Sequence, residues 1–287
     1  MDYIKYYDEI VSKRHSVREY SDREVEEEII SELKEYYEGI GRLTDADTEL
    51  LILDASFGGK VGKSAGYNGF FVEAPGYLIL LSDKSEHYLE NAGYIGQGLT
   101  LKLTELGVQT CWLTINDSYA LKAAAGVESD KEASVIIAFG YEAEQKKEKR
   151  LDIKSPSNVR MIESESKAAP KIRIDDFAFG KVYGKPLDVS ILYTGLSDAI
   201  IAAGRSQSFF NRQPYRLIVD DAVVSLIGLE DEMTTEEDTL LNYGICMFDF
   251  YAVLSANRNG AETWTFEDSD IELKLPAGAR YIAKCRI

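Results

Sequence analysis

Residues 91–112 read NAGYIGQGLTLKLTELGVQTCW, and residues 242–264 read NYGICMFDFYAVLSANRNGAETW. Both stretches begin with Asn-x-Gly and continue through an apolar run, and they end in Thr-Cys-Trp and Thr-Trp respectively. The first asparagine of the second stretch lies 151 positions after that of the first, in a chain of 287 residues. Two similar stretches half a chain apart indicate an internal repeat.

Each apolar run predicts a long helix, over residues 85–106 and 237–257. The first helix is apolar around most of its circumference, which is typical of a central helix. Two similar halves fused in one chain are expected to pack long helix on long helix across a pseudo-twofold axis, as a symmetric dimer does. We therefore predict an α+β fold, an intramolecular pseudo-dimer of two mixed sheet and helix halves. The halves are residues 1–150 and 151–287.

The remaining periodicity predicts shorter elements around these helices. A capping box at Ser21–Glu24 predicts the start of a helix over residues 22–38. Residues 151–190 have little periodicity and three prolines, so we expect a long wrapped connection there. The other expected helices are 2–13, 118–125 and 195–204, and the expected strands are 50–53, 77–81, 108–113, 134–139, 216–219, 223–227, 263–266 and 281–285.

The segment Arg14-His15-Ser16-Val17-Arg18 concentrates donors in a chain with 49 acidic and 32 basic residues. Alternate residues of an extended segment point the same way, so Arg14, Ser16 and Arg18 can converge on one anion. Two guanidiniums and a hydroxyl suit a phosphate. A solvated loop before a helix is the competing interpretation. A second basic cluster, Lys146–Arg150, is either part of such a site or a solvated linker.

The glycine-rich stretch Gly58–Ser64 offers two alternatives. It resembles a phosphate loop, but Gly58 and Gly62 enclose three residues where that loop needs four. Residues 62–66 also match the sequence pattern of a nucleophile elbow, which needs a strand–turn–helix context. A mobile glycine-rich loop is the default expectation. The aromatic residues that follow, Tyr67, Phe70 and Phe71, are either core residues or a lid.

Composition narrows the class of protein. The net charge of −17 argues against nucleic acid and against an anionic membrane surface as partners. No apolar run approaches the roughly 20 residues of a membrane span, and the first residues do not resemble a signal peptide. Cys111, Cys246 and Cys285 are widely spaced and odd in number, which favours buried free thiols in a reducing cytoplasm. With only two histidines besides, no metal site is expected.

Three motifs together resemble the nitroreductase superfamily of flavin mononucleotide (FMN) enzymes. Residues 14–18 resemble its Arg-x-Ser-x-Arg phosphate motif, and Ser208-Phe209-Phe210-Asn211-Arg212-Gln213-Pro214-Tyr215 resembles its Pro-Ser-x-x-Asn-x-Gln-Pro-Trp motif. Residues 107–113, with Gly140-Tyr141 downstream, resemble its Leu-Gly-x-x-Thr-x-Trp and Gly-Tyr pattern. The resemblance is to the branch in which two nitroreductase-like halves are fused.

This resemblance implies one FMN per chain, held between the halves, because each half has only one of the two complementary motifs. It places ten residues around the cofactor. Arg14, Ser16 and Arg18 would hold the phosphate and ribityl chain, with His15 beside the flavin and the pair Lys149 and Arg150 near the phosphate. Ser208 and Asn211 would reach the isoalloxazine, and Leu113 and Thr114 would lie along its edge near N5.

The resemblance also implies NAD(P)H-driven reduction of nitroaromatic or quinone-like acceptors by a ping-pong mechanism. No side chain is expected as catalytic acid or base. The expected partner is a small-molecule acceptor, and fused halves make a monomer plausible. The alternative is a degenerate, non-catalytic flavin-binding or interaction protein of the same fold. Thr114-Ile115 in place of Gly-Gly, Gln207 in place of proline and Tyr215 in place of tryptophan favour that alternative.

Overall fold

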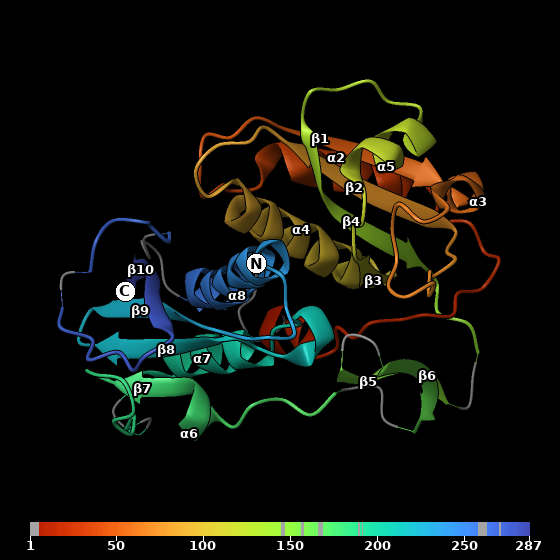
Figure 1. Ribbon diagram of the computed structural model, residues 1–287. Coiled ribbons are helices and arrows are strands. Elements are labelled where there is room, and N and C mark those ends of the chain that lie inside the picture. The colour runs from red at the N-terminus through yellow and green to blue at the C-terminus, as the bar shows by residue number, and fades with distance from the viewer. Residues whose placement is uncertain are drawn as a thin grey trace. The chain divides into compact units, whose positions relative to one another are not determined.

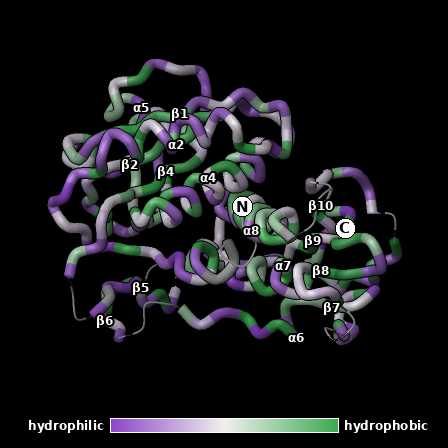
Figure 2. Tube along the Cα trace, turned by 180° about the vertical axis from the view of Figure 1, so that it is seen from behind, coloured by the Kyte–Doolittle hydropathy of each residue, from purple (hydrophilic) through white to green (hydrophobic). Residues whose placement is uncertain are grey.

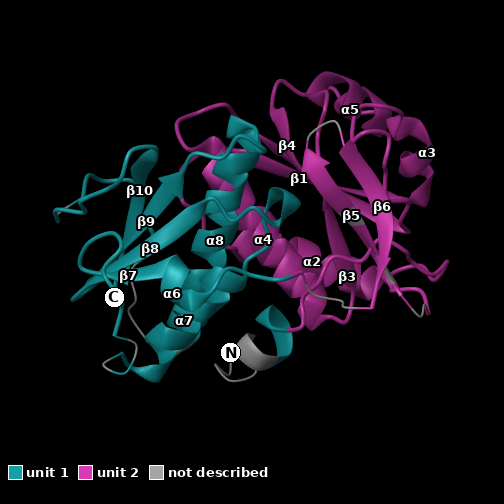
Figure 3. Cartoon of the chain, turned by 60° about the horizontal axis from the view of Figure 1, so that its bottom comes forward, with its two compact units in different colours: residues 1–12, 170–287 teal, residues 13–169 magenta. Residues whose placement is uncertain are grey.

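The computed structural model describes residues 6–144, 147–155, 158–165, 169–188, 190, 192–257, 263–269 and 271–287. The chain forms two compact units, Lys13–Ala169 and Met1–Ser12 with Pro170–Ile287 (Figure 3). The fold is of the predicted α+β class, with helices and several sheets in mixed order (Figure 1). The division of the repeat at residues 150 and 151 stays a prediction.

The unit 13–169 is built on a four-stranded antiparallel sheet of order β1-β2-β4-β3. Every residue of β2 is buried. One face of the sheet packs a core that includes Phe57, Leu121 and the odd-numbered residues of β2. The strands are β1 (Thr48–Asp54), β2 (Gly76–Ser82), β3 (Gln109–Leu113) and β4 (Glu132–Gly140), and the helices are α2 (Glu27–Gly39), η2 (Ala55–Phe57), α3 (Gly58–Val61), α4 (Tyr88–Glu105) and α5 (Ser118–Ala125).

The long helix α4 lies close against its own sheet because residue 96 is a glycine. A Cβ atom there would lie 2.7 Å from Cη2 of Trp112 in β3, which is too close for any other residue. The indole of Trp112 also donates to Thr100 Oγ1 of the same helix, at 3.0 Å. Gly96 and Trp112 therefore fix how α4 packs on the sheet.

The unit of residues 1–12 and 170–287 has a sheet of order β10-β9-β8-β7, in which β7 and β8 are parallel and the other pairs antiparallel. The N-terminal η1 packs against α7 and α8 of this unit, with Ile10 and Val11 buried. The strands are β7 (Ala178–Gly180), β8 (Tyr215–Asp220), β9 (Val223–Leu229) and β10 (Ala279–Arg286), and the helices are η1 (Tyr6–Val11, a π-helix), α6 (Ile174–Phe177), α7 (Thr194–Arg205), η4 (Phe209–Asn211) and α8 (Glu236–Asn257).

The two units repeat one order of elements. The series α2-β1-β2-α4-β3-β4 corresponds to α7-β8-β9-α8, a single bridge at Thr265, and β10. The asparagine that begins each repeated stretch makes the same bond. Asn91 Oδ1 accepts the backbone N–H of Leu43 at 2.8 Å, and Asn242 Oδ1 accepts that of Phe209 at 3.0 Å. The repeat therefore extends from sequence to hydrogen bonding.

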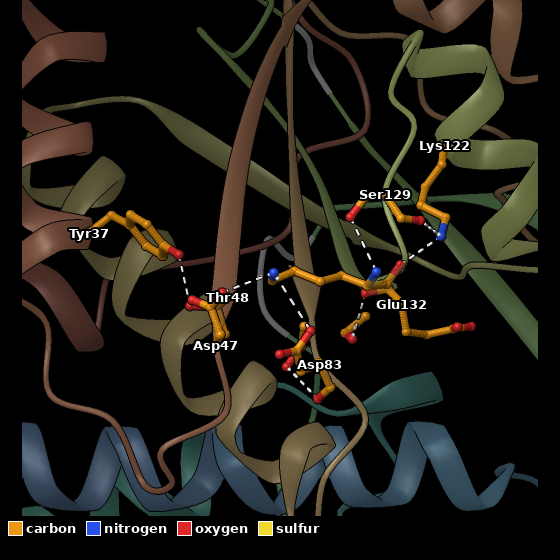
Figure 4. Close-up of polar contacts among 10 residues, drawn as sticks. Tyr37, Asp47, Thr48, Asp83, Lys122, Ser129 and Glu132 are labelled. Carbon is orange, nitrogen blue, oxygen red and sulfur yellow. Dashed lines mark hydrogen bonds and ion pairs between the residues drawn. The ribbon is translucent and has the colours of Figure 1, made fainter.

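Polar side chains tie together the strand ends of the unit 13–169 (Figure 4). Lys131, just before β4, pairs with Asp47 before β1 at 2.9 Å and with Asp83 after β2 at 3.6 Å. Lys122 of α5 donates to the carbonyls of Ser129 and Lys131, at 2.7 and 2.6 Å. Three strand ends and one helix are thus joined by two lysines.

The N-terminal predictions need correction. The helix expected from residue 22 begins at Glu27, and no side chain caps it. Ser21 does not form a capping box, because its backbone N–H donates to Tyr141 O at 2.8 Å and its hydroxyl donates to the same carbonyl at 3.3 Å. Pairing with a distant segment therefore keeps residues 21–26 out of the helix. Of the helix expected over residues 2–13, only 6–11 are helical, and residues 2–5 lie outside the described part.

The wrapped connection expected over residues 151–190 was also wrong. It contains an antiparallel hairpin of β5 (Glu148–Ser155) and β6 (Asn158–Ser164), followed by α6 and β7. In Figure 2 the hairpin is largely hydrophilic, whereas β2, β4 and β8 are largely hydrophobic, so hydrophobic periodicity gave little signal there. The strand expected at 263–266 pairs only through a bridge from Thr265 to Lys284.

One helix of the described chain, α8, is long and apolar enough to cross a membrane by length and composition alone. Within the structure, 61% of its apolar window is buried. It packs against α7, η1 and β9 of its own unit. This is the behaviour of a core helix, so α8 is weak evidence for a membrane span.

We predict that Asn91→Ala and Asn242→Ala each lower the free energy of unfolding by about 1 to 3 kcal/mol, because each leaves a loop N–H without its acceptor. Urea unfolding of both variants measures this. Asn158→Ala, at an exposed position in β6, is the control and should change stability by less than about 0.5 kcal/mol. Losses confined to one of the two asparagines would contradict the equivalence of the repeats.

Asp238, in the first turn of α8, should make stability depend on pH. Burial raises the pKa of its carboxyl from 3.8 to about 6, opposed by a hydrogen bond from Thr235. The folded state therefore holds this proton more tightly than the unfolded state, and stability falls as the pH rises through roughly 4 to 6. We expect Asp238→Asn to raise the melting temperature at pH 7.5 and to leave it unchanged below pH 4. An equal shift at both pH values would contradict this assignment.

Candidate functional site

The segment Arg14–Arg18 runs along the free edge of β3. Ser16 forms a parallel bridge with Thr110, and Val17 N donates to Thr110 O at 3.0 Å. Val17 is fully buried, whereas Arg14, Ser16 and Arg18 are only partly buried. The segment is thus extended, as the convergence of alternate side chains requires.

Arg14 and Arg18 act on the same buried group. Burial raises the pKa of the Cys111 thiol in β3, and the positive charges of Arg18 and Arg14 oppose that rise. Arg18 Nη1 also donates to the carbonyls of Ser16 and Lys149, at 3.3 and 3.2 Å. Both guanidiniums therefore lie at one part of the β3 edge, with the Ser16 hydroxyl between them in sequence. This donor set fits a phosphate.

The other basic residues of the prediction are placed differently from one another. Lys149 lies beside the segment, since its carbonyl accepts from Arg18 and its ammonium pairs with the carboxylate of Glu19. Arg150 is the next residue of β5 and therefore points to the opposite face, where it donates to Ser164 Oγ at 3.4 Å. The structure brings Lys149, but not Arg150, onto the side of Arg18.

His15 is held by two contacts from the same unit. Its Nδ1 lies 3.1 Å from the carbonyl oxygen of Lys13, and its Nε2 lies 3.5 Å from the Glu142 carboxylate. Glu142 follows the Gly140–Tyr141 pair at the end of β4. The position of His15 beside the flavin stays a prediction.

The residues after β3 are covered by the glycine-rich loop. Thr114 O accepts from Gly66 N at 2.8 Å, and Ile115 forms a bridge with Ala65. The side chains of Leu113 and Ile115 pack against the core of this unit. Ile115 is thereby accommodated in the core. The predicted contact of Leu113 and Thr114 with a flavin edge stays a prediction.

The glycine-rich loop is hydrogen-bonded to its surroundings and lacks the geometry of a phosphate loop. Ser64 is buried and its hydroxyl donates to Val61 O at 2.7 Å, while its carbonyl accepts the N–H groups of Asn116 and Asp117. The only helical turn, Gly58–Val61, precedes the Gly-Lys-Ser sequence, so no helix N-terminus faces an anion there. A Ser64 so engaged also lacks the exposure of a nucleophile elbow.

The aromatic residues after this loop differ in their contacts, and a lid formed by Tyr67 and Phe70 stays a prediction. Asn68 and Gly69, both with positive φ, form a tight turn in which Tyr67 and Phe70 exchange backbone hydrogen bonds of 2.9 and 2.8 Å. Phe71 stacks on Tyr77 with ring centroids 5.7 Å apart, so it is a core residue. Tyr67 and Phe70 stay partly exposed.

The second motif, residues 208–215, forms a loop that is held by several hydrogen bonds. Ser208 Oγ accepts from Gln213 N at 2.8 Å. Asn211 is bonded at both ends of its amide, because Oδ1 accepts from Lys171 Nζ and Nδ2 donates to Pro170 O, each at 2.6 Å. Residues 170–172 are thereby attached to the loop, and Ile172 N adds a bond of 3.0 Å to Gln213 Oε1. Gln207, which replaces the motif's proline, is buried.

Lys171 was not found from the sequence. It lies in a connection without periodicity, 40 positions before the asparagine that it contacts. It also donates to Ser206 O at 2.9 Å. A single lysine of this kind carries no sequence signal, because only the tertiary structure brings it to the motif.

One cavity, of about 560 Å³, opens at the connection from α2 to β1. None of the ten predicted residues lines it. The same connection in the other unit, from α7 to β8, is the loop that carries Ser208 and Asn211. In the described part of the chain no group of three His, Cys, Asp or Glu residues is arranged to hold a metal ion. The cavity is lined by Tyr37, Glu38, Arg42, Leu43, Thr44, Asp45, Ala46, Asp47 and Thr48.

Comparisons with known proteins agree with this architecture. The family "Putative TM nitroreductase" matches residues 7–175. The crystal structure of a nitroreductase-like protein of Thermotoga maritima is similar over 100% of this chain and 94% of its own, with 15% identity and a TM-score of 0.58. No curated protein matches the sequence.

Two further solved structures each match about half of the chain. An FMN-dependent nitroreductase of Clostridium difficile covers 49% of this chain and 90% of its own, with 23% identity and a TM-score of 0.40. An iodotyrosine deiodinase bound to FMN and 3-iodo-L-tyrosine covers 48% of this chain and 90% of its own, with 22% identity and a TM-score of 0.41.

We predict that Lys171→Met lowers the free energy of unfolding by about 1 to 3 kcal/mol, because two acceptors lose a charged donor. Hydrogen exchange of the backbone amides of residues 206–213 should accelerate. Lys185→Met, at an exposed position of the same unit, is the control and should leave both readouts unchanged. Unchanged exchange in Lys171→Met would show that Lys171 does not fix the loop.

Proposed function

Because the chain belongs to the nitroreductase family, whose profile matches residues 7–175, we propose that it is an FMN-dependent oxidoreductase. It uses NAD(P)H to reduce flat acceptors of the nitroaromatic or quinone type. When bound, FMN supplies the two-electron chemistry of such a reaction. The side chains of this protein bind, orient and shield.

The observation that carries this proposal is the edge of β3. Arg14, Ser16 and Arg18 lie on an extended segment paired with Thr110, and both guanidiniums act on Cys111. In a chain of net charge −17, such a local concentration of positive charge favours a small anion over a large anionic surface. We assign the FMN phosphate to these three residues, with the charge of Lys149 beside them.

The second motif completes the proposal. Residues 14–18 carry the chain's copy of the phosphate motif, and residues 208–214 carry its copy of the Asn-x-Gln-Pro motif. We propose that Ser208 and Asn211 contact the isoalloxazine of the same FMN, so that one chain binds one cofactor. Arg150 points to the opposite face of β5, and its contact with the phosphate stays a prediction.

No described residue is needed as acid or base. The nicotinamide and the acceptor would bind in turn at the same open face of the flavin. Double-reciprocal plots of initial rate against NAD(P)H concentration, at several acceptor concentrations, should therefore be parallel. The halves are fused in one chain, which favours a monomer. We also propose a reducing cytoplasm as the compartment, since the three cysteines are buried and not joined in disulfides.

A second candidate is a non-catalytic protein of the same fold. The specific observation in its favour is the Asn211 amide, whose oxygen and nitrogen are both hydrogen-bonded within the chain. If these bonds persist in solution, Asn211 supports the loop and does not contact a ligand. Flavin binding distinguishes the two candidates.

We predict that the purified protein is yellow, or becomes so on addition of FMN, and quenches flavin fluorescence with a measurable Kd. Arg18→Ala should weaken FMN binding about tenfold or more, because a charged hydrogen bond is worth about 1.5 to 3 kcal/mol. Asn211→Ala should also weaken it.

Arg23→Ala is the control for Arg18. Arg23 lies five positions further on, stacks on the Tyr141 ring at 3.9 Å and pairs with Glu26. Its loss should leave FMN affinity unchanged. If the wild-type protein binds no flavin, the proposal that it is an enzyme is wrong. If Asn211→Ala binds FMN as wild type does, the site shared by the two motifs is wrong, but the phosphate site at residues 14–18 is not.

A further inference from the structure

The loop between α7 and β8 is held in a strained shape. Phe210, Asn211 and Gln213 have positive φ, at 51°, 58° and 49°. Asparagine tolerates this left-handed conformation, but for a bulky residue such as phenylalanine it is an outlier. Strained residues persist only where their surroundings over-determine them, so the contacts that hold this loop decide its shape.

Two side chains of α8 hold the start of the loop. Asn242 Oδ1 accepts the backbone N–H of Phe209 at 3.0 Å, and Asp249 Oδ2 accepts the hydroxyl of Ser206 at 2.6 Å. The two side chains lie seven positions apart, which places them on the same face of the helix. Because Ser206 is the residue that ends α7, these bonds attach the loop to α8 from its first residue.

The serine that Asp249 holds is also a partner of the lysine that holds the second motif. Ser206 O accepts from Lys171 Nζ at 2.9 Å, and the same ammonium donates to Asn211 Oδ1 at 2.6 Å. Ser206 is 1% exposed and Asp249 is 2% exposed. A buried carboxylate and an ammonium are thus joined through one buried serine, and the ammonium reaches the Asn211 amide.

The other unit has the same scaffold without the carboxylate. Asn91 of α4 makes the equivalent bond to its own loop. Seven positions after Asn91 stands Gly98, which is buried, and the residue that ends α2 is the apolar Ile40. Gly98 and Ile40 therefore stand in this repeat where Asp249 and Ser206 stand in the other.

The carboxylate is not explained by the packing of the long helix. An aspartate is almost never fully buried unless it is paired, because removing its charge from water is unfavourable. The glycine at the equivalent position of α4 shows that such a helix packs on its own unit without a carboxylate. The carboxylate occurs in the unit whose loop carries the second motif, so we look to that loop for its role.

We propose that Asp249 is a positioning residue for the second motif. Its carboxylate fixes the Ser206 hydroxyl, and the Ser206 carbonyl then lies where it shares the ammonium of Lys171 with Asn211. Asp249 acts through these residues and does not touch the ligand. This inference rests on the proposed function, since it assigns to Asp249 the orientation of the Asn211 amide in the flavin site.

The first test reads the loop without flavin. Asp249→Asn removes the charge and Ser206→Ala removes the hydroxyl, and each should accelerate backbone hydrogen exchange of residues 206–213 by about tenfold. Ser206→Thr keeps the hydroxyl and should exchange as wild type does. Cys246→Ala is the control, because Cys246 is also buried on α8 and contacts the Ala203 carbonyl of α7. It should leave the exchange of the loop unchanged.

The second test separates positioning from a loss of stability. Asp249→Asn should weaken FMN binding by about tenfold in the wild-type background. It should have no further effect in Asn211→Ala, because its action passes through Asn211. In Arg18→Ala the two losses should add. A purely structural role would lower the affinity by the same factor in both backgrounds.

Two results would overturn the role of Asp249. One is unchanged hydrogen exchange of residues 206–213, or unchanged FMN affinity, in Asp249→Asn. The other is an equal loss of FMN affinity from this substitution in the wild-type and Asn211→Ala backgrounds. Titration of wild-type protein with FMN tests the proposed function separately. If wild type binds no FMN, both proposals are wrong, whereas wild-type binding with either result above removes the role of Asp249 alone.

Discussion

Each unit depends on one hydrogen bond, from the backbone of a loop to a buried asparagine on the long helix. Asn91 of α4 holds Leu43, and Asn242 of α8 holds Phe209. The bond fixes where the chain leaves one helix and enters the first strand of the sheet. A side-chain amide suits this task, because it offers an acceptor to a loop N–H that no strand or helix satisfies.

The connection from the helix to the first strand of the sheet differs between the two units. Between α2 and β1 it borders a cavity lined by polar and charged side chains. Between α7 and β8 it carries the strained loop with Ser208, Asn211 and the stacked phenylalanines. A common scaffold bond thus supports one connection without strained residues and one that concentrates them. Local irregularity of this kind is where function is expected on an otherwise regular fold.

The electrostatics of residues 14–18 follow from their place at a sheet edge. Val17 is buried and anchors the strand-like pairing, which leaves its neighbours on both sides near the surface. Arg18 meanwhile caps two backbone carbonyls and Lys149 pairs with Glu19. Backbone carbonyls and one carboxylate therefore hold these two cations beside the edge of β3.

By itself the sequence determined the elements with strong periodicity and the repeat. The helix at 118–125, the long helices and the central strands lie within a few residues of their expected bounds. This is because burying one face of a helix or strand requires apolar residues at a regular spacing in the sequence. The extended form of residues 14–18 was also predictable from alternation. Tertiary structure alone decided the rest, since long-range pairing leaves no local pattern. Ser21 bonds Tyr141 and so delays a helix, and Lys171 reaches Asn211 across 40 positions.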